Sequence, residues 1–134
     1  MKKRILYVNN DTQIVRLLSM RLNANNSDVN VAYNGYQCVQ VAKDDLPDLI
    51  LLDINTLFGG GIRALKTLKT MADTSKIPVI TITAYASKEV KRLVLELGAS
   101  DLISKPLNSD ELMEKIKTTL GCKNLSLDKM LFYQ

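Results

Sequence analysis

The sequence predicts an α/β domain in which a parallel β-sheet is covered by helices on both faces. Five short runs rich in β-branched and aliphatic residues alternate with runs whose apolar residues recur every three or four positions. Such an alternation builds right-handed βαβ units and therefore a parallel sheet. The run 49–53 has four consecutive apolar residues, as expected for a strand buried on both faces. At 134 residues the chain is long enough to bury one core.

The five expected strands are short runs separated by residues that favour turns. The first is followed by Asn9-Asn10-Asp11, the second is broken by Gly35, and the fourth is introduced by Pro78. The second alternates polar and apolar residues, which indicates a more exposed strand than the third. The expected strands are residues 4–8, 29–32, 49–53, 79–83 and 102–104.

The helices expected between these strands have recognisable starts. Asp11 or Asn10 is predicted to cap the first helix and Ser87 the fourth, because short polar side chains accept hydrogen bonds from free backbone N–H groups. Asn108 followed by Glu111 resembles a capping box for the last helix. The predicted inner-face residues are Ile14, Leu17, Leu18 and Leu22; Tyr36, Val39 and Ala42; Ile62, Leu65 and Leu68; Val90, Leu93, Val94 and Leu97; and Leu112, Ile116 and Leu120.

We expect one domain over residues 1–121, followed by a tail over residues 122–134. No repeat or linker interrupts the pattern before Gly121, which ends the last expected helix. In the tail, Leu127, Met130 and Leu131 have helical spacing. The tail is consistent with a frayed terminus, a docking helix or the start of a linker.

The composition argues against several classes of function. Hydrophobic residues make up 46% and charged residues 24%, which is ordinary for a globular domain, and the net charge of +4 is spread along the chain. The absence of histidine excludes histidine-based triads, histidine metal sites and a phosphohistidine within this chain. Cys38 and Cys122 lack metal-ligand spacing and indicate thiols in a reducing compartment. We therefore expect a cytoplasmic protein without a direct nucleic-acid or membrane partner.

Polar residues stand where the expected strands end. Asp53 closes the third strand, Thr83 closes the fourth and Lys105 follows the fifth, while Asn9 and Asn10 follow the first. The carboxyl ends of parallel strands share one edge of the sheet, so these side chains should lie close together. A carboxylate can accept a phosphoryl group, and an ammonium and a hydroxyl suit the binding of its oxygens. The sequence thus predicts a phosphate-receiving site.

This pattern resembles the receiver domain of two-component response regulators, a flavodoxin-like fold of the chemotaxis-receiver type. The resemblance covers residues 3–120. It implies a three-layer, doubly wound, five-stranded sheet with strand order 2-1-3-4-5. The motifs that carry it are Leu51-Leu52-Asp53-Ile54, Thr83-Ala84, Gly98-Ala99-Ser100-Asp101 and Ser104-Lys105-Pro106-Leu107.

The resemblance assigns roles to the strand-end residues. Asp53 would be the phospho-acceptor, Thr83 the hydroxyl that turns toward the phosphoryl group, and Lys105 the pocket lysine, with a cis peptide bond before Pro106. The chain would be a phosphorelay signalling domain and not an enzyme in the usual sense. A histidine kinase or phosphotransfer protein would donate the phosphoryl group. A downstream protein would bind the face formed by the fourth helix, the fifth strand and the fifth helix.

The family also implies Mg²⁺ as cofactor, held by Asp53 and the backbone carbonyl of Asn55. It usually has two acidic residues after the first strand, where this chain has Asn9 and Asn10. Amide oxygens carry no charge, so we expect these two to be weak magnesium ligands. We also hypothesise that Lys105 and Asp53 form a direct ion pair in the resting state.

These departures leave an alternative function, a phosphorylation-independent interaction module on the same scaffold. Leu102 stands at the family's aromatic switch position, so gating by that side chain is not expected, and Tyr85 is a candidate substitute. A flavin- or nucleotide-binding enzyme on this fold is a third interpretation. It is disfavoured because no glycine-rich fingerprint follows the first strand.

Overall fold

A computed structural model describes residues 3–9, 11–24, 27–55 and 60–121 and shows a five-stranded parallel sheet with strand order β2-β1-β3-β4-β5. Both the fold class and the strand order predicted above are therefore confirmed. The strands are β1 (Lys3–Val8), β2 (Ser27–Ala32), β3 (Leu49–Asp53), β4 (Val79–Thr83) and β5 (Asp101–Ser104). The helices are α1 (Thr12–Ala24), α2 (Gly35–Asp45), α3 (Gly61–Thr70), α4 (Lys88–Glu96) and α5 (Ser109–Thr119).

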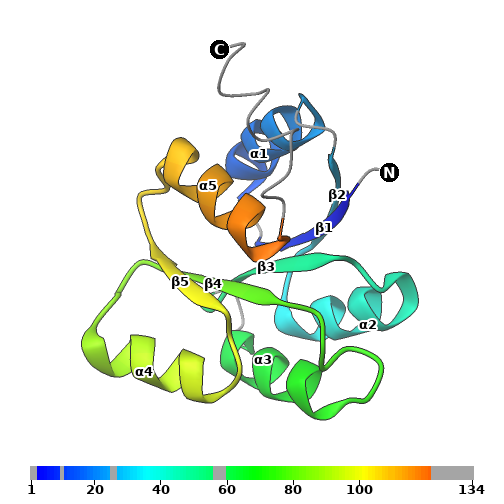
Figure 1. Cartoon of the computed structure of the whole chain (residues 1–134), viewed down its shortest axis with the longest axis vertical. Coiled ribbons are helices and arrows are strands. Elements are labelled where there is room, and N and C mark those ends of the chain that lie inside the picture. The colour runs from blue at the N-terminus through cyan, green and yellow to red at the C-terminus, as the bar shows by residue number, and fades with distance from the viewer. Residues whose placement is uncertain (1–2, 10, 25–26, 56–59, 122–134) are drawn as a thin grey trace.

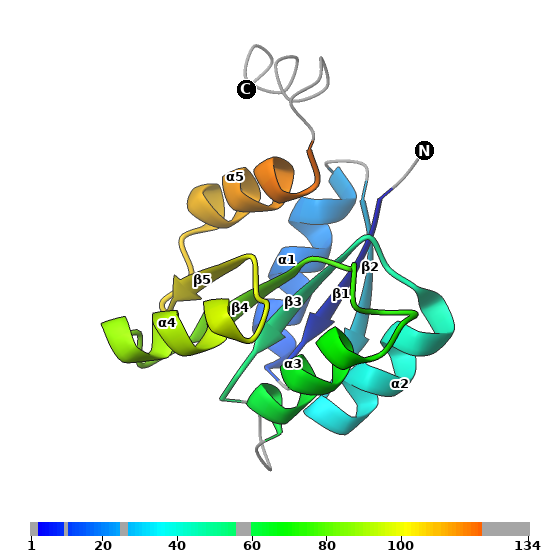
Figure 2. The ribbon, with the colours of Figure 1, turned by 60° about the horizontal axis from the view of Figure 1, so that its bottom comes forward.

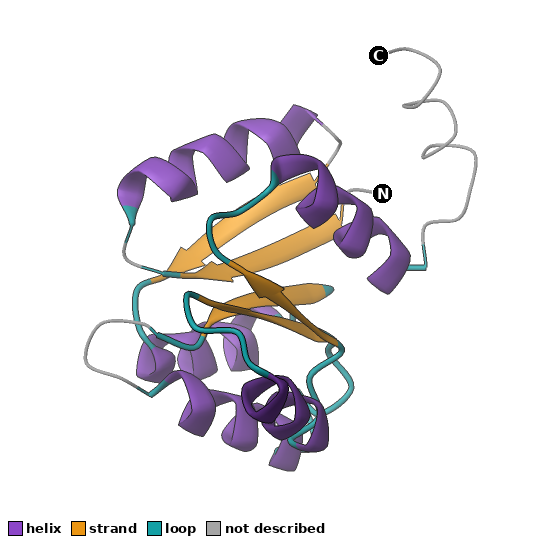
Figure 3. Ribbon diagram, turned by 90° about the vertical axis from the view of Figure 1, so that its left-hand side faces the viewer, coloured by secondary structure: helices purple, strands orange, loops and turns teal. Residues whose placement is uncertain are grey.

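Helices cover both faces of the sheet (Figures 1 and 2). In Figure 3, α1 and α5 lie above the strands and the other three helices lie below them. The alternation of side chains along each strand divides the core accordingly. In β1, Leu6 and Val8 join the core beneath α2, α3 and α4, whereas Ile5 and Tyr7 join the core beneath α1 and α5. No helix in the described part of the chain is long and apolar enough to cross a membrane.

The central strand β3 positions the functional edge. Every residue of β3 is buried, and Asp53 lies opposite Ile82 of β4 in the parallel register. Backbone pairing continues past the strand ends, because Ile54 N–H donates to the Ile82 carbonyl over 2.9 Å and Lys105 N–H donates to the Thr83 carbonyl over 2.8 Å. These bonds hold Ile54 and Lys105, and with them the neighbouring Asp53, at one edge of the sheet.

The predicted caps are formed. Asp11 Oδ1 accepts from Gln13 N–H over 3.0 Å at the start of α1, and Ser87 and Asn108 accept in the same way at the starts of α4 and α5. Asn34 caps α2 by accepting from Gln37 N–H over 2.9 Å, a cap that the sequence analysis did not identify.

Two predicted inner-face residues are wrong. Tyr36 is 77% exposed, and the buried residues of α2 are Gly35, Cys38 and Ala42. The helix is turned so that Gly35 contacts α3, where a Cβ atom on Gly35 would lie 2.3 Å from the Gly60 carbonyl oxygen. Leu93 is 43% exposed, because α4 lies beside the edge strand β5 and buries only a narrow stripe. The side chains of Ile14, Leu17 and Leu22 lie outside the described part of the structure.

Cys38 gives a test of this packing. Burial raises the pKa of its thiol to about 12, whereas the unfolded thiol ionises near 9.0. The stabilising effect of the protonated thiol is therefore complete below pH 9 and is lost between about pH 9 and 12, by up to about 1.4 kcal/mol per pH unit. Urea unfolding at a series of pH values, in a Cys122→Ser background, should show this decline.

The matched control is Cys38→Ala in the same background. The other titrating groups contribute to both proteins, so the difference between their free energies of unfolding isolates the thiol. Parallel pH profiles for the two proteins would contradict the proposed burial.

Candidate functional site

Asp53 lies at the carboxyl edge of the sheet with a carboxylate that is only 1% exposed. Its Oδ2 forms an ion pair with Lys105 Nζ, and its Oδ1 accepts a hydrogen bond from Asn55 N–H over 2.8 Å. The direct ion pair expected from the sequence is confirmed. A cis peptide bond joins Lys105 to Pro106, also as expected. A buried carboxylate requires such compensation, because its transfer out of water is costly when it is unpaired.

Thr83 is connected to Asp53 through hydrogen bonds of Asn55. Its hydroxyl donates to Asn55 Oδ1 over 2.7 Å and accepts from Tyr85 N–H over 3.1 Å. Ala84 N–H also donates to Asn55 Oδ1, over 3.2 Å. Asn55 therefore joins the carboxylate on β3 to the hydroxyl at the end of β4. The sequence analysis assigned Asn55 a backbone role only, and its place two residues after the acceptor was the available signal.

Asn9 presents a hydrogen-bond donor to the acceptor carboxylate. It is 3% exposed, and its Nδ2 donates to Asp53 Oδ2 over 2.8 Å and to Tyr7 Oη over 3.1 Å. Its Oδ1 accepts from Asp11 N–H over 3.1 Å. Asn10 lies outside the described residues, as does the segment 56–59 that follows Asn55.

Tyr7 is a site residue that the sequence analysis counted only as part of a strand. Its side chain is completely buried, and this burial raises the pKa of the phenol to about 12. The phenol is consequently neutral at physiological pH. The hydrophobic pattern does not distinguish Tyr7 from an aliphatic strand residue. Its hydroxyl was the one signal in the sequence that it could form a hydrogen bond at the site.

The candidate switch residues take different environments. Leu102 is half-buried and packs against the core cluster beneath α2, α3 and α4. Tyr85 is 76% exposed and follows Thr83 and Ala84 in the loop before α4. Its backbone N–H, described above, ties that loop to the Thr83 hydroxyl.

The oxygen atoms available as metal ligands at this site fit a weakly held magnesium ion. Asp53 supplies a carboxylate and Asn55 a backbone carbonyl, and both are the hard oxygen ligands that Mg²⁺ prefers. Asn9, however, turns its N–H toward Asp53 and gives its oxygen to Asp11 N–H. No cluster of three acidic or thiol side chains able to hold a metal occurs among the described residues. Within the part of the chain that the structure describes, Asp53 would thus be the charged ligand of such an ion.

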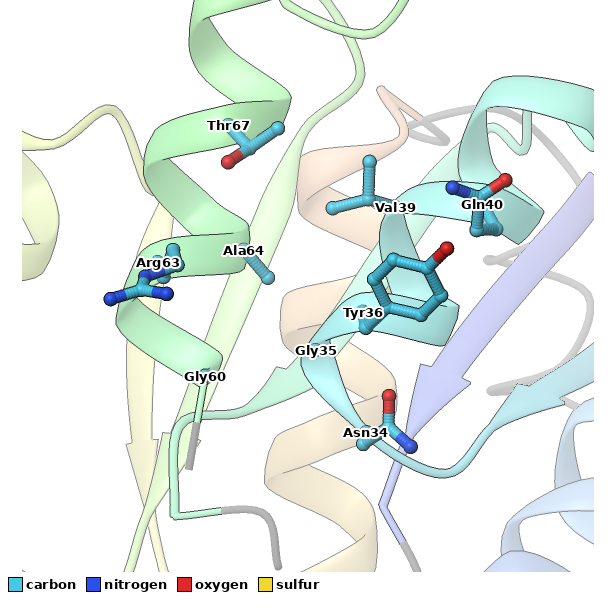
Figure 4. Close-up of a pocket in the computed structure, with 9 residues that line it drawn as sticks. All are labelled: Asn34, Gly35, Tyr36, Val39, Gln40, Gly60, Arg63, Ala64 and Thr67. Atoms are coloured by element: carbon cyan, nitrogen blue, oxygen red, sulfur yellow. The ribbon is translucent and has the colours of Figure 1, made fainter. Parts of the chain in front are cut away.

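A separate hollow of about 600 Å³ lies between α2 and α3 (Figure 4). Its lining includes Tyr36 and Val39 from α2 and Arg63 and Thr67 from α3. Asp53 is not part of its lining, so the hollow is distinct from the carboxylate site.

Comparison with known proteins gives a family match over most of the chain. The sequence model of the response regulator receiver domain matches residues 5–117. The transcriptional regulatory protein CpxR of Escherichia coli (strain K12) is 38% identical over 117 residues, which are 87% of this chain and 49% of that protein. The chain thus spans about half the length of this relative.

Solved structures share the fold. The BeF3-activated N-terminal receiver domain of Klebsiella pneumoniae RstA is 28% identical, with a TM-score of 0.79 over 87% of this chain and 97% of that one. The receiver domain of the sensor histidine kinase PA1611 from Pseudomonas aeruginosa is 23% identical, with a TM-score of 0.80 over 90% of this chain and 99% of that one. The PA1611 domain has a magnesium ion coordinated in its active-site cleft.

The ion pair generates a prediction about stability. Replacing Lys105 by Met leaves the buried Asp53 carboxylate without a cation and should lower the free energy of unfolding by about 1–3 kcal/mol. Urea unfolding at neutral pH measures the change.

The surface pair between Arg21 and Asp110 is the matched control, since the Asp110 side chain is 88% exposed. Asp110→Asn should change the free energy of unfolding by less than about 1 kcal/mol. Equal losses in the two variants would show that burial of Asp53 does not govern the strength of its pair.

Proposed function

The chain belongs to the response regulator receiver domain family of two-component systems, and from this premise we propose that Asp53 accepts a phosphoryl group from a partner histidine kinase or phosphotransfer protein. The observation that carries the proposal is the buried Asp53 carboxylate held against the Lys105 ammonium. A carboxylate nucleophile beside a fixed cation is the arrangement that phosphoryl transfer to a side chain requires. The relationship to CpxR, a transcriptional regulatory protein, supports a signalling role.

The chemistry follows from the contacts at Asp53. A carboxylate oxygen of Asp53 forms a bond to phosphorus while the bond between phosphorus and the donor breaks. Lys105 then neutralises charge on the phosphoryl oxygens, since its ammonium already lies at Oδ2. Asp53 and the Asn55 carbonyl, and weakly Asn9 and Asn10, would hold Mg²⁺, which would supply additional positive charge there.

Asn55 connects the acceptor Asp53 to Thr83 and so to the loop before α4. A phosphoryl group on Asp53 offers new acceptor oxygens beside the Asn55 N–H, and Thr83 can exchange its bond to Asn55 Oδ1 for one to a phosphoryl oxygen. Because the Tyr85 N–H bonds to the Thr83 hydroxyl, the loop before α4 would follow that movement. We propose that a downstream protein binds the face formed by α4, β5 and α5.

That face carries both apolar and ionic groups. Leu93 and Leu95 are exposed on α4, at 43% and 41%. The ion pair between Asp101 and Lys115, at 2.7 Å, joins β5 to α5. Exposed leucines on α4 suit a protein partner better than a surface that only faces solvent.

Phosphorylation of Asp53 is directly testable. Incubation with Mg²⁺ and acetyl phosphate should add the mass of one phosphoryl group to the intact protein, and Asp53→Asn should abolish the gain, because an amide is not a nucleophile for this reaction. Intact-protein mass spectrometry measures the outcome.

Asp48→Asn is the matched control, since Asp48 directly precedes β3 at the opposite edge of the sheet. This variant should retain the mass gain. Wild-type protein that gains no mass would leave the alternative function, a phosphorylation-independent interaction module, to which the family match gives no support.

Restoring the acidic pair should strengthen the metal site. In Asn9→Asp/Asn10→Asp, two carboxylates join Asp53, so Mg²⁺ affinity should rise by at least about tenfold. Calorimetric titration with Mg²⁺ measures the change, with Asp11→Asn as a comparison for a nearby acid that caps α1. An unchanged affinity would mean that positions 9 and 10 do not face the ion.

A further inference from the structure

Tyr7 is a buried strand residue whose hydroxyl contacts the acceptor site through Asn9. It belongs to β1, lies opposite Leu51 of β3, and packs with the core cluster beneath α1 and α5. Its hydroxyl nevertheless accepts a hydrogen bond from Asn9 Nδ2 over 3.1 Å, and the same nitrogen donates to Asp53 Oδ2 over 2.8 Å. A chain of contacts thus runs from the buried phenol through one amide to the acceptor carboxylate.

The polarity of the partners fixes the direction of the Asn9 amide. A carboxylate can only accept and a backbone N–H can only donate, so Nδ2 must face Asp53 and Oδ1 must face Asp11 N–H. The Tyr7 hydroxyl takes the second Nδ2 hydrogen as acceptor. Turning the Asn9 oxygen toward a cation at Asp53 would break the bonds to Asp53 and to Asp11 N–H, and the Tyr7 hydroxyl would have to change from acceptor to donor.

We propose that Tyr7 is a positioning residue that, acting through Asn9, holds a hydrogen-bond donor against Asp53 Oδ2 and thereby restricts access of Mg²⁺ to the acceptor. The assignment rests on the proposed function in one respect, that Asp53 is the acceptor to which the cation is recruited. The Asn9 side-chain amide donates a hydrogen bond to the Asp53 carboxylate. In the resting state this carboxylate oxygen is therefore hydrogen-bonded without a metal.

A purely structural role for Tyr7 makes a different prediction. If the ring only fills the core, then phenylalanine would serve equally, and removal of the hydroxyl would change stability without changing metal binding. The Tyr7 hydroxyl accepts from Asn9 Nδ2 over 3.1 Å, a contact that phenylalanine cannot make. Only the positioning role links the hydroxyl to the affinity for Mg²⁺.

The test is an NMR titration of the whole chain with Mg²⁺, following the backbone amide of Asn55. Tyr7→Phe removes one of the three bonds that hold the Asn9 amide, so the Mg²⁺ dissociation constant should fall by about fivefold, the factor expected for one neutral hydrogen bond. Tyr36→Phe is the matched control, because Tyr36 is exposed on α2, and it should leave the constant unchanged.

A second pair of variants establishes that the effect passes through Asn9. In an Asn9→Asp background the side chain offers oxygen in either orientation, so adding Tyr7→Phe should change the dissociation constant by less than about twofold. If Tyr7→Phe alone unfolds, the proposal can still be tested by comparing the dissociation constant of the double variant with that of Asn9→Asp. Circular dichroism checks that each variant is folded.

Three outcomes would overturn the proposal: equal dissociation constants for Tyr7→Phe and the native chain, a fivefold effect that persists in the Asn9→Asp background, or no response to Mg²⁺ in any of these proteins. The titration contains no phosphodonor. Its result is therefore separate from the proposed function, which fails only if Asp53 gains no phosphoryl group.

Discussion

The buried charge of Asp53 is the constraint on which the functional edge depends. A carboxylate that is 1% exposed is stable only when donors surround it, and here an ammonium, a side-chain amide and a backbone N–H do so. These donors come from the segments that follow β5, β1 and β3. The carboxylate thereby ties three separate parts of the chain to one point at the edge of the sheet.

The same contacts determine what can change when Asp53 changes. Asn55 bonds to the carboxylate through its backbone and to Thr83 through its side chain, so the two groups are coupled without touching. Thr83 in turn bonds to the backbone of Tyr85 in the loop that leads to α4. A short series of hydrogen bonds therefore connects the Asp53 carboxylate to the loop that leads to α4.

Asn9 determines the polarity of the resting site on one side of Asp53. Where a carboxylate would repel Asp53, the neutral amide donates a hydrogen bond to it. Tyr7 and Asp11 hold it in that orientation from either side. The family fold is thus retained with a hydrogen-bond donor, and not an acid, beside the Asp53 carboxylate.

The sequence alone determined the elements, the order of functional residues along the chain, and the ion pair of Asp53 with Lys105. The elements depend on local patterns, such as the Ser87 cap, which act over a few residues. The ion pair could be expected because the carboxyl ends of parallel strands share one edge of the sheet. Only the tertiary structure decided that Tyr36 faces outward, since the rotation of α2 is set by the contact of Gly35 with α3. It also decided the side-chain bridge of Asn55 and the link between Tyr7 and Asn9. Such hydrogen bonds depend on rotamers and on partners brought together by folding, which spacing along a chain does not encode.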